Sequence, residues 1–275
     1  MDRQAILTEF SETLMGLGRE DPTIRKYTQV AGAFLNEVEA DLPTQRDALR
    51  YLGRMRDGYK ANSRNLYYYA LKALFGQMGW AWDIPAPKSK TQDYEQLDQP
   101  VLATGEIQQI IESAKRHQDP ELAAYFAVSS TYGLRRCQLA AIRPEHLQDG
   151  KLFVQPSKGG RPYRHQIPPQ IAPHLEGIRW RGDIKRMDRL FKYLLFSAFG
   201  DIADYYGYGW HAVRRALVTE LNRRGLDIML LYKFMRWKAW GMITMPLIYS
   251  HLEDEATDQA IFEKHPFLGM WGAQP

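Results

Sequence analysis

Apolar residues in the first part of the chain recur at helical spacing. After Asp21 and Pro22, which are typical of a helix start, an apolar residue follows at nearly every third or fourth position. The same spacing predicts a helix before Gly16 and two further helices over about residues 43–58 and 62–79. Together these segments predict a small bundle of four helices.

Residues 83–100 interrupt this pattern. They contain three prolines and almost no apolar periodicity, which predicts an extended linker between domains. We therefore expect a helical domain over residues 1–82, this linker, and a second domain over residues 101–275. The length of the chain suits two separate cores.

The second domain combines helical periodicity with one β signal. Residues 151–155 and 163–167 have strand character, and Gly159 and Gly160 between them suit a hairpin turn. Helices are predicted near residues 184–198, 211–224 and 226–236. The expected fold class is mainly α, with an N-terminal helical bundle and a mostly helical C-terminal domain that contains a small β-hairpin.

The net charge of +4 is unevenly distributed. Residues 42–90 carry a net charge of +6 and residues 151–240 one of +10, whereas the stretches around and between them are acidic. A polyanion bound from two sides would need such an arrangement, so the distribution favours nucleic acid as a partner. Two solvated helix faces would give the same distribution, and charge alone leaves both interpretations open.

Several kinds of site are excluded. Cys137 is the single cysteine, so no disulfide forms within the chain, and a reduced compartment, the cytoplasm, is expected. The sequence has no phosphate-binding loop, no HExxH motif and no zinc-type spacing of cysteine or histidine. No apolar run reaches the roughly 18 residues of a membrane helix, and the N-terminus does not resemble a signal peptide. We expect no metal, no cofactor and no membrane contact.

Five short segments of the second domain carry candidate chemistry. In chain order they are Thr131–Leu139 with Arg135, Ser157–Pro168 with Lys158, His211-Ala-Val-Arg214, Trp237, and Ile248–His251 with Tyr249. Their order and spacing resemble the motifs of the tyrosine recombinase (phage integrase) family, and Trp237 is similar to the tryptophan of its Cre-like members. The resemblance covers about residues 100–270, whereas the first domain matches the family's core-binding domain only in helical character and position.

The sequence departs from the family pattern at two places. Gln138 stands where an acidic residue is usual, and we expect reduced rigidity there. The segment from Trp237 to Tyr249 is three residues longer than the family pattern leads one to expect.

The resemblance implies that Arg135 and Arg214 bind the scissile phosphate. Two guanidiniums can hold its non-bridging oxygens bidentately as negative charge grows during attack. Trp237 offers one indole N–H to the same phosphate.

The remaining roles implied by the resemblance concern protons and the covalent bond. Tyr249 is the nucleophile, Lys158 protonates the departing 5′ oxygen, and His211 handles the proton of the nucleophile. Because a phosphotyrosyl bond conserves the energy of the phosphodiester, neither a metal nor ATP is needed.

The implied function is site-specific DNA recombination. A 3′-phosphotyrosyl intermediate would lead through a Holliday junction, in a homo-tetramer on two double-stranded DNA sites, with accessory DNA-bending proteins as further candidate partners. A prokaryotic cell, a virus or a mobile element would be the setting. Two alternatives stay open: a type IB topoisomerase-like nicking-closing enzyme, and a non-catalytic DNA-binding protein on the same fold.

Further basic residues are candidates for DNA contact. They are Arg46, Arg50, Arg54 and Arg64 in the first domain and Arg161 and Arg164 on the hairpin. His165 is a further candidate for phosphate contact, and Arg236 is interpreted as a surface or backbone-contacting residue. The apolar residues of the C-terminal tail, Ala260, Ile261, Phe262 and Phe267, are expected to pack on a neighbouring protomer.

Overall fold

The chain forms two compact units, Met1–Gln96 and Leu97–Pro275. A computed structural model describes residues 2–38, 42–55, 61–87, 99–157, 162–237 and 253–272. Lys158, Arg161 and Tyr249 lie outside the described residues, as does most of the expected linker. The division between the units falls within that linker, and the domain limits at residues 82 and 101 stay a prediction.

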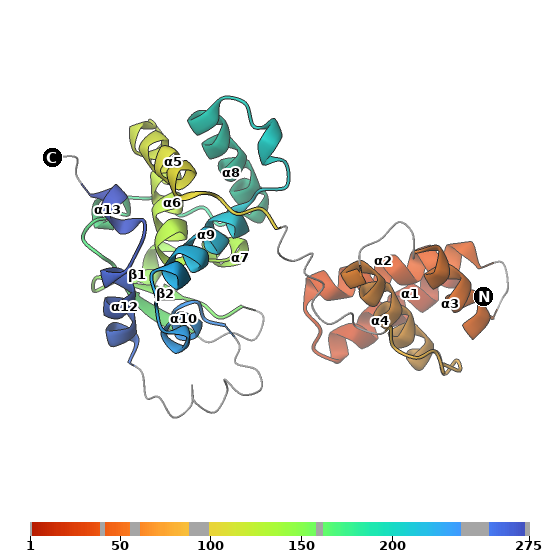
Figure 1. The fold of residues 1–275 in the computed structure, drawn as a ribbon. Helices are drawn as coiled ribbons and strands as arrows, with labels where there is room; N and C mark the ends of the chain where they lie inside the picture. The colour runs from red at the N-terminus through yellow and green to blue at the C-terminus, as the bar shows by residue number, and fades with distance from the viewer. Residues whose placement is uncertain are drawn as a thin grey trace. The chain divides into compact units, whose positions relative to one another are not determined.

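The N-terminal unit is helical, as expected. Its helices are α1 (Arg3–Gly16), α2 (Asp21–Glu37), α3 (Gln45–Arg54) and α4 (Ala61–Gln77) (Figure 1). Phe34 of α2 packs its ring on Tyr51 of α3 and Phe75 of α4, with ring centroids 5.5 and 5.8 Å apart. These aromatic contacts join three of the helices around one core.

Two of the helix starts in this unit differ from those that the sequence predicts. Glu20, not Asp21, is the N-cap of α2, so that Asp21 and Pro22 belong to its first turn. Helix α3 begins after Thr44, whose backbone N–H donates to the Asp47 carboxylate at 2.9 Å in a capping box.

The C-terminal unit is mostly helical with one small sheet. Its helices are α5 (Thr104–Arg116), α6 (Pro120–Tyr132), α7 (Arg136–Ala140), α8 (Ile184–Phe199), α9 (Trp210–Arg223), α10 (Ile228–Phe234), α12 (Asp254–Glu263) and α13 (Leu268–Trp271). Single 3₁₀ turns cover Pro144–His146, Ala172–His174 and Ala203–Tyr205. The strands β1 (Leu147–Gln148), β2 (Lys151–Val154) and β3 (Tyr163–Gln166) form an antiparallel sheet in the order β1-β2-β3.

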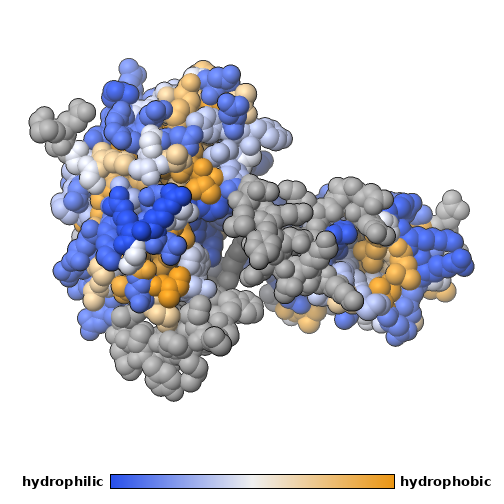
Figure 2. Space-filling view, viewed as in Figure 1, coloured by the Kyte–Doolittle hydropathy of each residue, from blue (hydrophilic) through white to orange (hydrophobic). Residues whose placement is uncertain are grey.

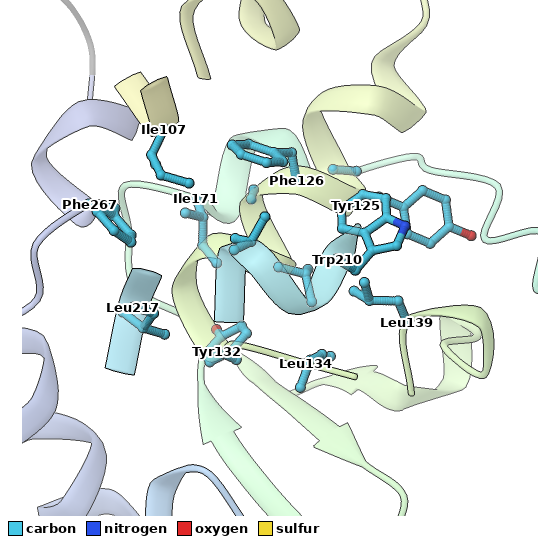
Figure 3. Packing of buried hydrophobic residues seen from close by; sticks show 14 of the residues in the cluster. Ile107, Tyr125, Phe126, Tyr132, Leu134, Leu139, Ile171, Trp210, Leu217 and Phe267 are labelled. Carbon is cyan, nitrogen blue, oxygen red and sulfur yellow. The ribbon is translucent and has the colours of Figure 1, made fainter. Parts of the chain in front are cut away.

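Helix α6 lies at the centre of this unit. Every residue from 121 to 132 is buried, so the helix has no polar face. Figure 3 shows Phe126 and Trp210, from α6 and α9, within one packed cluster, and the Trp210 indole N–H donates to the Met187 carbonyl at 2.8 Å. A helix that is apolar all round must be surrounded by other elements, which explains its central place.

Strand β1 was not expected from the sequence. It pairs with β2 in the register Leu147↔Leu152 and Gln148↔Lys151. Asp149 and Gly150 connect the two strands with φ of 52° and 69°. Positive φ at two successive residues is what a tight hairpin turn requires, and an Asp-Gly pair is a common signal for it.

The C-terminal tail packs on its own chain. Ile261, Phe267 and Trp271 are 0–2% exposed and belong to the core of the C-terminal unit. The expectation that Ile261 and Phe267 cover a neighbouring protomer is therefore wrong for this structure. In Figure 1 helix α12 lies beside α10 and the sheet, so the tail packs against the unit that carries the candidate site.

The surface is largely hydrophilic. Figure 2 shows hydrophilic residues over most of the visible face, with smaller hydrophobic areas between them. Among the described helices, none combines the length and the apolar character needed to cross a bilayer.

His265 anchors the C-terminal tail to the last turn of α6. Its Nε2–H donates to the Thr131 carbonyl at 2.9 Å, and its Nδ1 accepts the backbone N–H groups of Phe267 and Leu268 at 3.1 Å each. This arrangement requires a neutral imidazole, because a proton on Nδ1 would face two donors. Burial lowers the pKa of His265 to about 4.

The stability of the C-terminal unit should therefore depend on pH through His265. Its pKa is about 4 in the folded protein and 6.5 ordinarily, so the unfolded chain takes up the proton first. The contribution of His265 to the free energy of unfolding should fall as the pH drops from 6.5 towards 4. His265→Gln should lose less stability over this range, as measured by urea unfolding at each pH. Equal pH slopes in the two proteins would contradict this role.

Candidate active site

Arg214 is held between the ends of two helices. It lies on α9, is 6% exposed, and donates from Nη1 to the Gly133 carbonyl and from Nη2 to the Met235 carbonyl at 2.8 Å. Gly133 caps the end of α6, and Met235 caps the end of α10. The last carbonyls of a helix lack partners in the helix and carry partial negative charge, so they suit a guanidinium.

The same two helix ends lead directly into other candidate residues. Arg135 follows α6 by three positions and is half-buried, and Trp237 follows α10 by three positions and is also half-buried. The guanidinium carbon of Arg214 lies 5.9 Å from the centroid of the Trp237 ring. The bonds of Arg214 to the two carbonyls therefore bring Arg135 and Trp237 to one site.

Gly133 makes this close approach feasible. Its φ is +56°, in the left-handed region that side chains rarely adopt. A Cβ built there would lie 2.8 Å from Met235 Cε, 3.3 Å from Leu217 Cδ2 and 3.4 Å from Arg214 Cγ. The backbone conformation thus requires glycine, and an added Cβ would in addition displace the end of the Met235 side chain and crowd Leu217.

Gln138 supports the first arginine. Its Oε1 accepts the backbone N–H of Arg135 at 3.1 Å, and its Nε2 donates to the Gln155 carbonyl at 3.2 Å. Arg135 Nη1 also donates to Ser157 Oγ at 3.4 Å, next to Lys158 in the sequence. The amide of Gln138 therefore links the Arg135 turn to the segment that leads into the lysine hairpin.

His211 lies in the first turn of α9 and is exposed. It precedes Arg214 by three positions, so the two side chains project from the same side of the helix. The structure thus brings Arg135, Arg214 and Trp237 together, with His211 on the same helix side as Arg214. Lys158 and Tyr249 lie outside the described residues.

The site is strongly cationic. Burial and the neighbouring guanidiniums of Arg236 and Arg135 hold the pKa of Arg214 well below its ordinary value. Among the described residues, no carboxylate forms an ion pair with Arg135 or Arg214. A bound anion would offset the repulsion between these arginines, so the arrangement suits a phosphate.

The candidate DNA-contacting arginines are mostly at the surface. Arg46, Arg50 and Arg54 are exposed on α3, where Arg54 pairs with Glu37 and Arg50 lies 3.9 Å from Asp47. Arg64 on α4 is half-buried, Arg164 on β3 is exposed, and Arg161 lies outside the described residues.

Two residues differ from their sequence interpretation. His165 is 0% exposed and therefore does not contact a phosphate at the surface. Arg236, expected at the surface, is 2% exposed and lies next to the site. No periodic pattern in the sequence marks either residue as buried, because polar residues become buried only where tertiary partners satisfy them.

The chain is similar in sequence to two curated tyrosine recombinases. No family model matches the chain. It is 26% identical over 249 residues to the tyrosine recombinase XerA of Pyrococcus furiosus, covering 85% of both chains. It is 28% identical over 247 residues to XerA of Pyrococcus horikoshii, covering 84% of both.

Solved structures show the same fold. A lambda integrase (75–356) dimer bound to a COC′ core site matches with a TM-score of 0.64 and 17% identity, over 88% of this chain and 96% of that chain. A lambda integrase tetramer bound to a Holliday junction matches with a TM-score of 0.63 and 17% identity, over 88% and 76%. The fold is therefore that of integrase catalytic domains. The XerA relatives support the tyrosine recombinase family as the family of this chain.

Replacing Gly133 with alanine should cost more stability than the left-handed backbone conformation alone accounts for. We expect Gly133→Ala to lower the free energy of unfolding by about 2–4 kcal/mol, from left-handed strain and overpacking against Met235 and Leu217. The matched control is Gly177→Ala, because Gly177 has a φ of +67° and nothing within 4 Å of an added Cβ. Gly177→Ala should cost only about 1–2 kcal/mol. Equal losses in urea unfolding would show that space at Gly133 is not limiting.

Proposed function

We propose that this chain is a site-specific DNA recombinase that cleaves and rejoins DNA through a 3′-phosphotyrosyl intermediate. The observation that carries the proposal is the position of Arg214. Its bonds to the ends of α6 and α10 place a buried cation beside Arg135 and Trp237, in a site without a paired carboxylate among the described residues. Lys158 and Tyr249 accompany these residues in the sequence in the order of the family motifs.

Arg135 and Arg214 bind the non-bridging oxygens of the scissile phosphate. A guanidinium has five N–H donors, so Arg214 keeps donors for the phosphate while two nitrogens also bond to carbonyls. These donors are in place before the reaction, so no reorganisation is needed as charge develops on phosphorus. Trp237 adds its indole N–H.

The covalent step exchanges one P–O bond for another. The Tyr249 oxygen attacks phosphorus while His211 accepts the phenol proton, and the bond from phosphorus to the 5′ oxygen breaks. Lys158 donates a proton to that oxygen, so a 5′ hydroxyl leaves. The reverse reaction with the 5′ hydroxyl of a partner site completes strand exchange without a metal or ATP.

Solved structures with the same fold support a tetrameric assembly. Lambda integrase has been solved as a tetramer on a Holliday junction, and XerH as a complex with its difH substrate. We propose a tetramer of this chain on two duplex sites, with residues 1–82 as a core-binding domain. Arg46, Arg50, Arg54 and Arg64 would contact DNA from that domain, and Arg161 and Arg164 would do so from the hairpin.

Covalent capture tests the nucleophile. Nicked duplexes tiled across the DNA that flanks the gene serve as suicide substrates, since the short strand beyond the cleavage site diffuses away. Wild-type protein should form an SDS-resistant adduct with one sequence, and Tyr249→Phe should form none because the attacking oxygen is missing. An adduct with Tyr249→Phe would show that the nucleophile is another residue. Adducts with every duplex, together with relaxation of supercoils, would favour a type IB topoisomerase-like enzyme.

Lys158 is tested by changing the leaving group. Lys158→Ala should slow cleavage of a normal duplex by about 100-fold or more, because an alkoxide leaves poorly without a proton donor. In a 5′-phosphorothiolate substrate, sulfur replaces the departing 5′ oxygen. It leaves as a thiolate, which does not need that proton. Single-turnover cleavage of this substrate should be nearly as fast in Lys158→Ala as in wild type. A variant that stays slow on both substrates would remove Lys158 as the general acid.

A further inference from the structure

A buried chain of three side chains lies beside the candidate site. His165 on β3 contacts Arg236 Nη1 through its Nε2 and Asp258 Oδ1 through its Nδ1, the latter at 3.0 Å. His165 and Asp258 are 0% exposed and Arg236 is 2% exposed. None of the three side chains is available to solvent.

One protonation state satisfies all of these contacts. A guanidinium only donates, so His165 Nε2 accepts from Arg236, and the imidazole proton is on Nδ1 and donates to Asp258. Burial lowers the pKa of His165 and so favours this neutral form. The Asp258 carboxylate also accepts the Gln166 backbone N–H at 2.6 Å and the Tyr163 hydroxyl at 3.2 Å. Burial raises the pKa of Asp258 to about 7, so this carboxyl is partly protonated near neutral pH. A neutral imidazole thus links it to the Arg236 guanidinium.

Arg236 adopts a conformation that is unusual for its residue type. Its φ is 54°, in the left-handed region that residues other than glycine rarely adopt. Arg236 also donates to the Phe234 carbonyl at 2.8 Å and to the Tyr132 carbonyl at 3.0 Å. Arg214 binds the next carbonyl along in each case, those of Met235 and Gly133. The two arginines therefore hold the same pair of helix ends side by side.

The buried chain also connects both flanks of the segment that carries Tyr249. Arg236 precedes that segment and is adjacent to Trp237, whereas Asp258 follows it on α12. His165 lies on β3, the strand that follows the Lys158 turn. The His165 imidazole thus links β3, which follows Lys158 in the sequence, to two other places in the chain. These are Arg236, which precedes Tyr249, and Asp258, which follows it.

Other contacts of α12 are weaker anchors. Lys151 pairs with Glu255 and Lys233 pairs with Asp254, and in both pairs at least one partner is substantially exposed. Pairs of this kind contribute little to stability. A buried charge pair costs desolvation, and its best-attested benefit is that it selects one arrangement of its neighbours. Asp258 is the buried polar anchor of α12 against β3, and the Tyr163 hydroxyl of β3 also lies 3.0 Å from the Asp254 carbonyl of α12.

We propose that Arg236, His165 and Asp258 are positioning residues for strand cleavage. Their buried hydrogen bonds set the two flanks of the Tyr249 segment against β3 and against the helix ends that Arg214 occupies. This inference rests on the proposed function. Because the three side chains are buried, their loss should slow the covalent step and leave the concentration of DNA needed for half-saturation unchanged.

Single-turnover cleavage of the suicide duplex by the full-length chain tests this role. Asp258→Asn replaces the carboxyl with an amide of nearly the same shape, and Arg236→Gly removes the guanidinium at a backbone position that glycine tolerates. Each should lower the maximal cleavage rate by about 10-fold or more, since small errors in placing a nucleophile have large effects. Millimolar guanidinium should restore part of the rate in Arg236→Gly and none in Asp258→Asn. The matched control is Arg215→Met, because Arg215 also donates to a carbonyl, that of Pro100 at 2.8 Å, but lies outside the buried chain.

The outcomes separate the two proposals. No adduct from wild type on any duplex would overturn the proposed function itself. An adduct from wild type with unchanged rates in folded Asp258→Asn and Arg236→Gly would overturn only the positioning role. A rate loss that matches the unfolded fraction in thermal melts, or an equal rise in the half-saturating DNA concentration, would also overturn it. Should Arg236→Gly fail to fold, Asp258→Asn decides alone.

Discussion

The candidate site is built around the buried guanidinium of Arg214. Arg214 donates to carbonyls at the ends of α6 and α10, two helices that are far apart in the sequence. A helix end buried without partners would leave carbonyls unsatisfied, and a buried cation without acceptors would be more costly still. The guanidinium of Arg214 and the helix-end carbonyls therefore satisfy each other. Their hydrogen bonds also restrict the positions of the residues that follow α6 and α10.

This constraint explains how the proposed phosphate site can be both buried and cationic. Arg135, Arg214 and Arg236 repel one another, and burial together with this repulsion lowers the pKa of Arg214. The helix-end carbonyls around Arg214 and the Asp258 carboxylate beyond His165 partly offset that repulsion. Neither the helix-end carbonyls nor Asp258 places a carboxylate in contact with Arg135 or Arg214. Their guanidiniums therefore remain suited to bind an anion of the substrate.

Much of the fold could be predicted from the sequence. Helices α1 to α4 and the β2–β3 hairpin follow from periodicity and turn residues, because these signals act between near neighbours along the chain. Helix α6 was missed since it is apolar on every side, which leaves no period to detect. Strand β1 was missed although Asp149-Gly150 is a hairpin signal, since two residues are too few to show alternation.

The sequence by itself determined the order and spacing of Arg135, Lys158, His211, Arg214, Trp237 and Tyr249, and from these the kind of chemistry to expect. Only the tertiary structure decided which polar residues are buried. Arg236 and His165 look like surface residues in the sequence, yet each is buried because partners distant in the sequence satisfy its donors and acceptors. Local patterns report what a residue prefers next to its neighbours, whereas the cost of burying a charge is set by groups that meet only after the chain has folded.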